Sequence, residues 1–242
     1  MFEFTIIGNT KLYNQDNRKI FDQIPDKSID LILTDPPYNI SKYSTGNISL
    51  PNRTPLNNDI ASWDRVEVNP FDYIQHFKRI LKPTGNIFIF TTYNCIGKWH
   101  EVFDEHFDTT QFMVWHKTNP TPNIFKKSFL NSCELIICFW NKGHTWNFSN
   151  QKEMHNFIES SICMGPERLK DPKHPAQKPI KILQHLIEIA SNENAVVFDP
   201  FMGVASTGIA ALKTGRKFYG CEIQKEYYLA SIERIKNFYS KS

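Results

Sequence analysis

Short apolar runs of β-forming residues alternate with amphipathic helical segments along most of the 242-residue chain. This alternation is typical of βα units, which build a parallel sheet between two layers of helices. The length fits one such domain, so residues 1–242 are expected to form a single α/β domain with a mostly parallel sheet. The predicted strands cover residues 29–34, 86–91, 111–116, 133–140, 195–198 and 217–221, with a weaker one at 10–14.

Proline, asparagine and glycine mark the ends of the predicted helices. Asn69 and Pro70 are typical of a helix start, and Pro83 and Gly85 of a helix end. The predicted helices cover residues 70–82, 94–106, 179–190, 206–213 and 225–239.

Two segments depart from this pattern. Residues 39–66 are polar and rich in turn-forming residues, so we expect a long, mobile loop of functional importance. Residues 141–175 carry aromatic residues, lysines and prolines, and are expected to lie on the sheet rather than to form part of it.

Charge and cysteine content limit where the chain works and what it binds. The net charge is +3, but residues 117–181 hold ten Lys/Arg against five acids. This surplus fits either a polyanion-binding segment or an ordinary solvated surface. The five cysteines form no CxxC pair, which favours reduced thiols in the cytoplasm and no metal site. No apolar run approaches the roughly 20 residues of a membrane span, and no secretory signal is visible.

The sequence Asp-Pro-Pro-Tyr at residues 35–38 directly follows a predicted strand. Parallel sheets bind ligands beyond the carboxyl ends of their strands, where Asp35 is expected. The two prolines cannot continue the sheet, and their fixed φ orients the carbonyl of Pro36. This carbonyl and the carboxylate can accept both protons of an exocyclic amine, while Tyr38 can stack on a flipped base. A turn that caps the strand is the competing interpretation.

The C-terminal third contains an apolar run, a turn with Asp199 and Gly203, and a helix that begins at Ser206. Free N–H groups at such a turn suit a nucleotide, and Glu222, about 20 residues on, is placed for ribose hydroxyls. Neither GxGxxG nor GxxxxGK[ST] is present, so a nucleoside without pyrophosphate is favoured. An ordinary βαβ turn with a surface glutamate would look similar.

Residues 174–179, His-Pro-Ala-Gln-Lys-Pro, precede a predicted helix. Lys178 and Gln177 offer a cation and an amide that suit an amino-acid carboxylate. A proline-rich helix entry with a surface lysine is the simpler alternative.

Together, and in this order, these three motifs resemble the amino-group DNA methyltransferases that use S-adenosylmethionine. The resemblance covers nearly the whole chain, including the Cys-Glu-Leu-Ile-Ile run at 133–137. The order, catalytic motif before cofactor motif, is similar to that of the β group, and most similar to short bacterial enzymes that methylate adenine N6. It implies a Rossmann-like methyltransferase fold with a permuted motif order.

By matched position, the resemblance implies roles for individual residues. The implied catalytic residues are Asp35, Pro36, Pro37 and Tyr38. The implied cofactor contacts are Asp16, His174, Gln177, Lys178, Phe198, Asp199, Phe201, Gly203, Ser206, Thr207 and Glu222. Two positions depart from the family: Val204-Ala205 stand where Ser-Gly is common, and Ala176 replaces a common Thr.

The resemblance also implies double-stranded DNA as the partner. We assign target recognition to residues 118–173, helped by the loop 39–66, with Trp146 and Phe148 as packing residues. The expected phosphate contacts are Lys126, Lys127, Lys142, Arg168 and Lys170. A homodimer and a restriction nuclease acting on the same site are possible partners.

Three functions remain open from the sequence. Methylation of adenine N6 is favoured, because cytosine-N4 enzymes of the family more often carry Ser at the position of Asp35. Cytosine N4 is the first alternative. The second is a catalytically silent DNA-binding subunit with the same fold.

Overall fold

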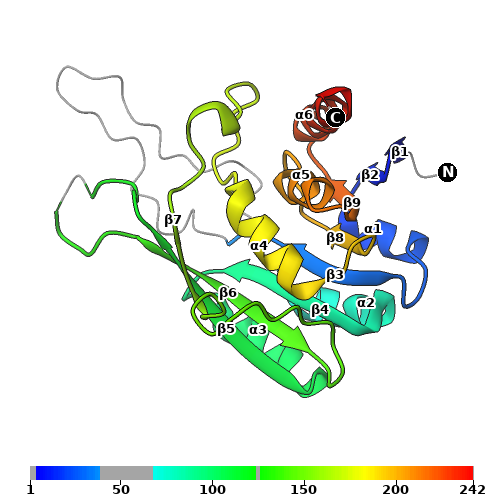
Figure 1. Ribbon diagram of the computed structural model, residues 1–242, viewed down its shortest axis with the longest axis horizontal. Helices are drawn as coiled ribbons and strands as arrows, with labels where there is room; N and C mark the ends of the chain where they lie inside the picture. Colours follow the sequence, from blue (N-terminus) through cyan, green and yellow to red (C-terminus); the bar gives the residue numbers. More distant parts are fainter. Residues whose placement is uncertain (1–3, 39–67, 124–125, 242) are drawn as a thin grey trace.

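The computed structural model describes residues 4–38, 68–123 and 126–241, and the predicted loop 39–66 lies outside them. The described residues form one nine-stranded sheet in the order β1-β2-β9-β8-β3-β4-β6-β5-β7, with helices on both faces (Figure 1). The strands are β1 Phe4–Ile7, β2 Thr10–Asn14, β3 Ile29–Thr34, β4 Leu81–Thr91, β5 Thr109–Lys117, β6 Cys133–Trp140, β7 Phe157–Ser160, β8 Val196–Asp199 and β9 Lys217–Glu222. The helices are α1 Asn17–Ile20, α2 Phe71–Ile80, α3 Ile96–Phe103, α4 Ile180–Ala190, α5 Ser206–Lys213 and α6 Lys225–Lys241.

Alternating side chains on the central strands create the two helix layers. On β3, Leu31 and Leu33 pack with α4, α5 and α6, whereas Ile29 and Ile32 pack with α1, α2 and α3. On β4, phenylalanines face the first layer and isoleucines the second. Strands buried on both faces consist of nearly continuous apolar runs, which is the pattern that predicted a parallel sheet.

Strand direction brings distant segments to one edge of the sheet. The neighbours β2, β9, β8, β3 and β4 run parallel, so their carboxyl ends meet there. β6 is antiparallel to both β4 and β5, so the end of β5 at Lys117 and the start of β6 at Cys133 reach the same edge. The end of β6 at Trp140 lies at the opposite edge.

Each predicted strand and helix has a counterpart in the structure, with shifted ends. The largest shift is in β4, which begins at Leu81 instead of residue 86, so that α2 ends at Ile80. The first part of β4 contains Pro83 and Gly85, and the β3–β4 register shifts between Ile29 and Leu31.

The prediction for residues 141–175 was wrong in one respect. Residues 157–160 form β7, which pairs with β5 and covers an edge that would otherwise expose unpaired backbone groups. Packing by Trp146 is confirmed, because its ring centroid lies 5.3 Å from Trp140 and 6.3 Å from Phe88. Phe148 is exposed instead. The short elements β1 and α1 were not predicted.

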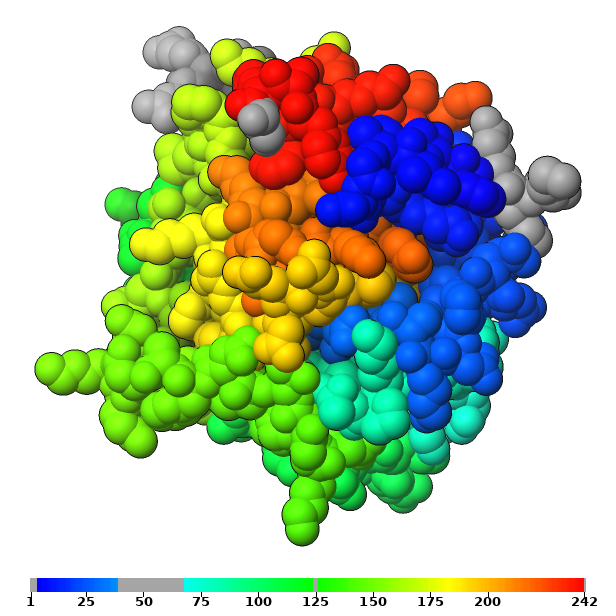
Figure 2. All heavy atoms as spheres, turned by 45° about the vertical axis from the view of Figure 1, so that its right-hand side comes forward, coloured from blue at the N-terminus to red at the C-terminus, as the bar shows by residue number. Residues whose placement is uncertain are grey.

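The N-terminal strands lie against the C-terminal helix, as the blue and red surfaces in Figure 2 show. The hydroxyls of Thr5 and Tyr228 are 2.7 Å apart, and the Asn9 amide donates to the Tyr239 hydroxyl at 2.7 Å. In the described parts of the chain, no helix is long and apolar enough to cross a membrane.

Candidate active site

A cavity of about 810 Å³ opens at the carboxyl edge of the sheet. Its size is within the range of cofactor and small-molecule sites. Phe198 is the one predicted site residue of the catalytic and cofactor sets that does not line it, because its ring is fully buried with the α1–α3 layer. The predicted residues that do line the cavity are Asp16, Asp35, Pro36, Pro37, Tyr38, His174, Gln177, Lys178, Asp199, Phe201, Gly203, Ser206, Thr207 and Glu222.

Asp199 organises the turn after β8. Its carboxylate accepts hydrogen bonds from the hydroxyls of Thr34 and Thr207, each at 2.8 Å, and from the amide of Phe201 at 3.0 Å. These bonds join β3, β8 and α5 at one buried group. Burial raises the pKa of Asp199 to about 6, although the three donors oppose this shift.

Glu222 connects the end of β9 to the same turn. Its carboxylate accepts from the amide of Gly203 at 3.0 Å and from that of Gln224 at 2.7 Å, while burial raises its pKa to about 7. Gly203 has a positive φ of 51°, and a Cβ there would lie 2.9 Å from the His174 ring. A side chain at position 203 would therefore strain the backbone and displace the His174 ring.

The start of α5 explains one departure from the family pattern. Ala205 has φ 58° and ψ 43°, the left-handed conformation that glycine adopts without cost. It is fully buried, and its amide donates to the Met202 carbonyl at 2.8 Å. The Arg234 guanidinium donates to the neighbouring Val204 carbonyl and to the Ser206 hydroxyl. The turn thus keeps its shape without the second glycine.

The opposite end of the cavity is polar and aromatic. Asp16 caps α1 and forms a salt bridge with Arg18 at 2.6 Å, which lowers the pKa of Asp16. The Asn17 side chain donates to the Pro200 carbonyl at 2.9 Å. The rings of Phe201 and Tyr73 lie 5.6 Å apart. A planar group with polar edges would fit between such side chains.

A compact group of charged residues surrounds Asp35. The Lys178 Nζ lies 2.5 Å from Asp35 Oδ2 and 2.7 Å from Glu134 Oε1. The Tyr38 hydroxyl donates to Asp35 Oδ1 and lies 3.1 Å from Glu134 Oε1. Lys117 completes the group with a 2.9 Å contact to Glu134 Oε2. Two carboxylates and two cations therefore share one corner of the cavity.

Burial and charge act in opposite directions in this corner. Burial raises the pKa of Asp35, with Lys178 opposing and Glu134 adding to the shift. Burial would also raise the pKa of Glu134, but Lys178 and Lys117 hold that pKa below its ordinary value. Burial, Asp35 and Glu134 together raise the pKa of the Tyr38 hydroxyl.

Gln177 and His174 have structural surroundings in addition to their place at the cavity. The Gln177 amide donates to the Glu167 carbonyl at 2.7 Å and accepts from the Leu169 amide at 3.0 Å, which ties residues 165–169 to the start of α4. The His174 ring lies 4.6 Å from the Tyr227 ring. Burial, with Lys178 and Arg234, lowers the pKa of His174 to about 4, so it is neutral at pH 7.

The model of one family, described as DNA methylase and covering both N6 and N4 enzymes, matches residues 29–233. The chain belongs to the DNA methylase family. This match includes the cavity residues from Asp35 to Glu222 and leaves out only the ends of the chain.

Curated relatives of this DNA methylase are type II methyltransferases. M2.LlaDCHI of Lactococcus lactis subsp. cremoris is 30% identical over 94% of the methylase and 89% of the relative. M.HinfI of Haemophilus influenzae is 32% identical over 88% of the methylase and 64% of the relative.

Solved structures share its Rossmann-like fold. The M1.HpyAVI–SAM complex is 26% identical with a TM-score of 0.67, and the alignment covers 93% of the methylase and 99% of that chain. The cytosine-N4-specific PvuII DNA methyltransferase has a TM-score of 0.73 at 18% identity, and the alignment covers 97% of the methylase and 92% of that chain. The predicted family and fold are therefore confirmed.

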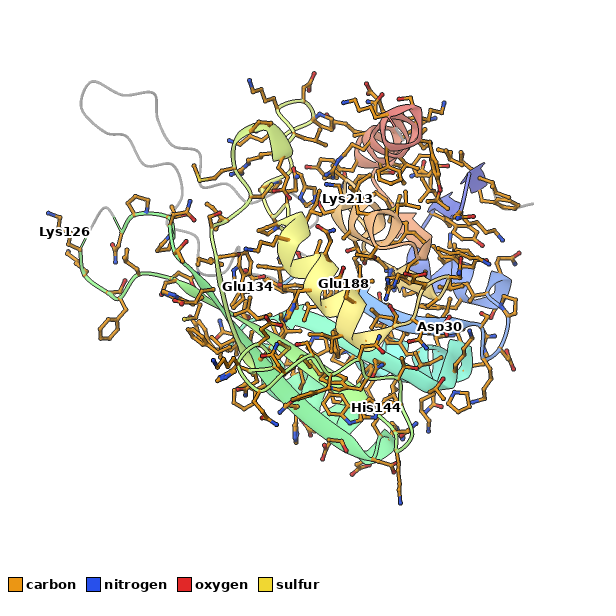
Figure 3. All side chains as sticks on the ribbon, viewed as in Figure 1. Asp30, Lys126, Glu134, His144, Glu188 and Lys213 are labelled. Carbon is orange, nitrogen blue, oxygen red and sulfur yellow. The ribbon has the colours of Figure 1, made fainter. Side chains whose placement is uncertain are left out.

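The methylase places its predicted DNA contacts at different ends of the sheet. Lys126 and Lys127 belong to the loop that joins β5 to β6, and Figure 3 shows Lys126 projecting far from the body. Arg168 lines the cavity, and Lys170 follows it on the same segment. Lys142 lies apart from the other predicted contacts, because β6 runs antiparallel and delivers it to the opposite edge, where its backbone amide donates to Asp108.

Two charged residues of the methylase site were not assigned from the sequence. Glu134 and Lys117 lie on β6 and β5 and reach the cavity through the antiparallel placement of β6. The available signal was a charged residue inside the apolar run Cys-Glu-Leu-Ile-Ile at 133–137.

Proposed function

We propose that this methylase transfers a methyl group from S-adenosylmethionine to N6 of adenine at specific sites in double-stranded DNA. The observation that carries the proposal is the placement of Asp35 and Tyr38 at the end of β3, beside the Asp199–Gly203 turn at the end of β8. A catalytic amine-binding group and a nucleoside-binding turn then share one cavity.

The described residues fit S-adenosylmethionine, which supplies an electrophilic methyl group when bound. Glu222 would accept hydrogen bonds from the ribose hydroxyls of the cofactor. Phe201 would pack on the adenine ring of the cofactor, near Asp16. The turn held by Asp199 and Gly203 and the start of α5 at Ser206 and Thr207 would hold the middle of the cofactor. His174 would pack against that turn, and Lys178 lies toward the catalytic corner.

Asp35 and the Pro36 carbonyl would accept the two N–H protons of the target amine. This arrangement localises the lone pair on the nitrogen, and Tyr38 offers a ring face to the flipped base. Pro37 keeps the segment from continuing the strand. The Asp at position 35 favours adenine over cytosine, and the intact set from Asp35 to Tyr38 argues against a catalytically silent subunit.

The loop between β5 and β6 supports DNA binding by the segment 118–173. Lys126 and Lys127 lie close in the sequence to Phe129, which is 100% exposed. Figure 3 shows Lys126 far from the body of the molecule. Lysines of this kind contact phosphates, and an exposed ring beside them suits insertion between bases. Arg168 and Lys170 would extend the basic surface. The type II relatives favour a nuclease acting on the same site, and a homodimer stays a prediction.

Transfer of tritium-labelled methyl groups to defined duplexes, followed by nucleoside analysis, tests the proposal. N6-methyladenine in one sequence context is the expected product. N4-methylcytosine would replace the proposed base, and cofactor binding without transfer to any nucleic acid would favour the silent subunit.

A further inference from the structure

Lys178 is a buried cation held between two carboxylates from different parts of the chain. Its side chain and that of Glu134 are each only 9% exposed. The Nζ also lies 5.0 Å from the centroid of the Phe90 ring and 5.5 Å from that of Tyr38. A buried ammonium is stable only when paired and hydrogen-bonded, so Asp35 and Glu134 together hold it in place.

Both oxygens of Asp35 are engaged in this arrangement. Tyr38 bonds Oδ1 and Lys178 bonds Oδ2, which fixes the plane of the carboxylate. Each carboxylate oxygen has a second lone-pair site, so Asp35 can still accept a hydrogen bond from the N–H group of an incoming amine. Glu134 contacts both the Tyr38 hydroxyl and Lys178, and so supports both partners of Asp35.

We propose that Glu134 and Lys178 are positioning residues that fix the orientation and the charge of Asp35 for acceptance of the target amine. The inference rests on the proposed amine-methylating function and adds to it two residues outside the Asp-Pro-Pro-Tyr motif. Lys178 keeps Asp35 an anion in a buried site, and Glu134 prevents Lys178 from binding Asp35 alone.

The charges that face Asp35 come from every element packed around it. Lys178 precedes α4, Glu134 lies on β6, Tyr38 follows β3, and Asp199 ends β8. Lys117 on β5 acts on Asp35 through Glu134. Lys178 favours the ionised form of Asp35, whereas Glu134 opposes it. Removing one or the other should therefore move the titration of Asp35 in opposite directions.

The test compares Lys178→Met and Glu134→Gln by the pH dependence of single-turnover methyl transfer. Lys178→Met should move the acid limb of the pH–rate profile, where Asp35 becomes ionised, to higher pH. Glu134→Gln should move this limb to lower pH. Each variant should also lose about a hundred-fold in rate at its best pH, because small misplacements of a catalytic group have effects of this size. Lys178→Arg should restore the acid limb toward that of the wild type.

Glu188→Gln is the matched control, since Glu188 is exposed on α4, the helix that follows Lys178. It removes a carboxylate from the far end of that helix, outside both the cavity and the segment assigned to DNA, and should leave the profile unchanged. Circular dichroism and cofactor binding show that each variant is folded.

A second measurement does not depend on activity. NMR titration of labelled aspartate carboxyl carbons, with Asp35→Asn to identify the signal, follows the ionisation of Asp35 directly. Opposite shifts in the two variants support the inference even if wild-type protein methylates no DNA, which would sink only the proposed function. Shifts in the same direction, or no shift in either variant, would overturn the inference.

Discussion

The Thr34 hydroxyl donates a 2.8 Å hydrogen bond to the buried carboxylate of Asp199. Thr34 directly precedes Asp35, and Asp199 begins the turn that lines the nucleoside side of the cavity. This side-chain bond, together with the pairing of β3 and β8, therefore joins the segment proposed to be catalytic to the turn proposed to hold the cofactor.

Thr34→Val should lower the free energy of unfolding by about 1–3 kcal/mol, because Asp199 loses a buried donor. Cofactor affinity and transfer rate should fall together. Thr91→Val at the end of the neighbouring β4 is the control, because the buried Thr91 hydroxyl has no hydrogen-bond partner among the described residues. Urea unfolding should find this control neutral or slightly stabilised; equal losses in both variants would contradict the role of the Thr34–Asp199 bond.

Asp35→Ala should reduce methyl transfer by about a hundred-fold or more, since the amine loses its charged acceptor. Cofactor binding should stay nearly intact, because the Asp199 turn and Glu222 are unchanged. Asp35→Asn keeps the shape of the side chain and should be similarly inactive. Tritium transfer and calorimetric titration check the two effects separately, and wild-type-like transfer by either variant would refute the mechanism.

Ala205→Gly should leave stability nearly unchanged although it removes a buried methyl group. Relief of the left-handed conformation, about 1–2 kcal/mol, offsets the lost burial of about 0.8 kcal/mol and the added freedom of the unfolded chain. Ala210→Gly in the middle of α5 removes the same group without this relief, and should cost about 1.5–2 kcal/mol. Thermal and urea unfolding measure the difference, and equal costs would argue against strain at Ala205.

The Glu222 carboxyl should destabilise the cofactor-free protein as pH rises from about 4.5 to about 7, an effect isolated by comparison with Glu222→Gln. The pKa of Glu222 rises from 4.5 in the unfolded chain to about 7 on folding, so the folded protein binds more protons in this window. The stabilising contribution of Glu222 to the free energy of unfolding is fully present below pH 4.5. It amounts to up to about 3 kcal/mol and is lost as pH rises through 7. Glu222→Gln should flatten the dependence between pH 6 and 7. The remaining dependence combines Asp199, whose stabilising effect is lost by about pH 6, with His174, whose lowered pKa of about 4 acts in the opposite direction.

Lys126→Ala and Lys127→Ala should weaken DNA binding and each reduce the salt-dependence slope by about 1. Lys142→Ala at the opposite edge of the sheet should change neither quantity. Fluorescence anisotropy at several salt concentrations measures both. A reduced slope for Lys142→Ala, with none for the two loop lysines, would place the DNA on the other edge.

The sequence predicted those parts of the site that depend on one segment at a time. Asp35 and Asp199 each follow a buried apolar strand, and parallel strands place such residues at a common edge. Glu134 was not assigned because its place depends on the insertion of β6 between β4 and β5, a strand order that no local pattern encodes. The same antiparallel direction separates Lys142 from the other predicted DNA contacts. The four-residue β7, only partly buried, has too short a pattern to predict.

The β5–β6 hairpin has its two strands rooted in the catalytic corner, with Lys117 at one base and Glu134 at the other. Lys126 and Lys127 stand on the loop between them. The two strands that carry the lysines proposed to contact DNA therefore also hold the ion-pair partners of Asp35 at their bases. In the proposed function, contact with the duplex and the setting of the Asp35 carboxylate would be coupled through this hairpin.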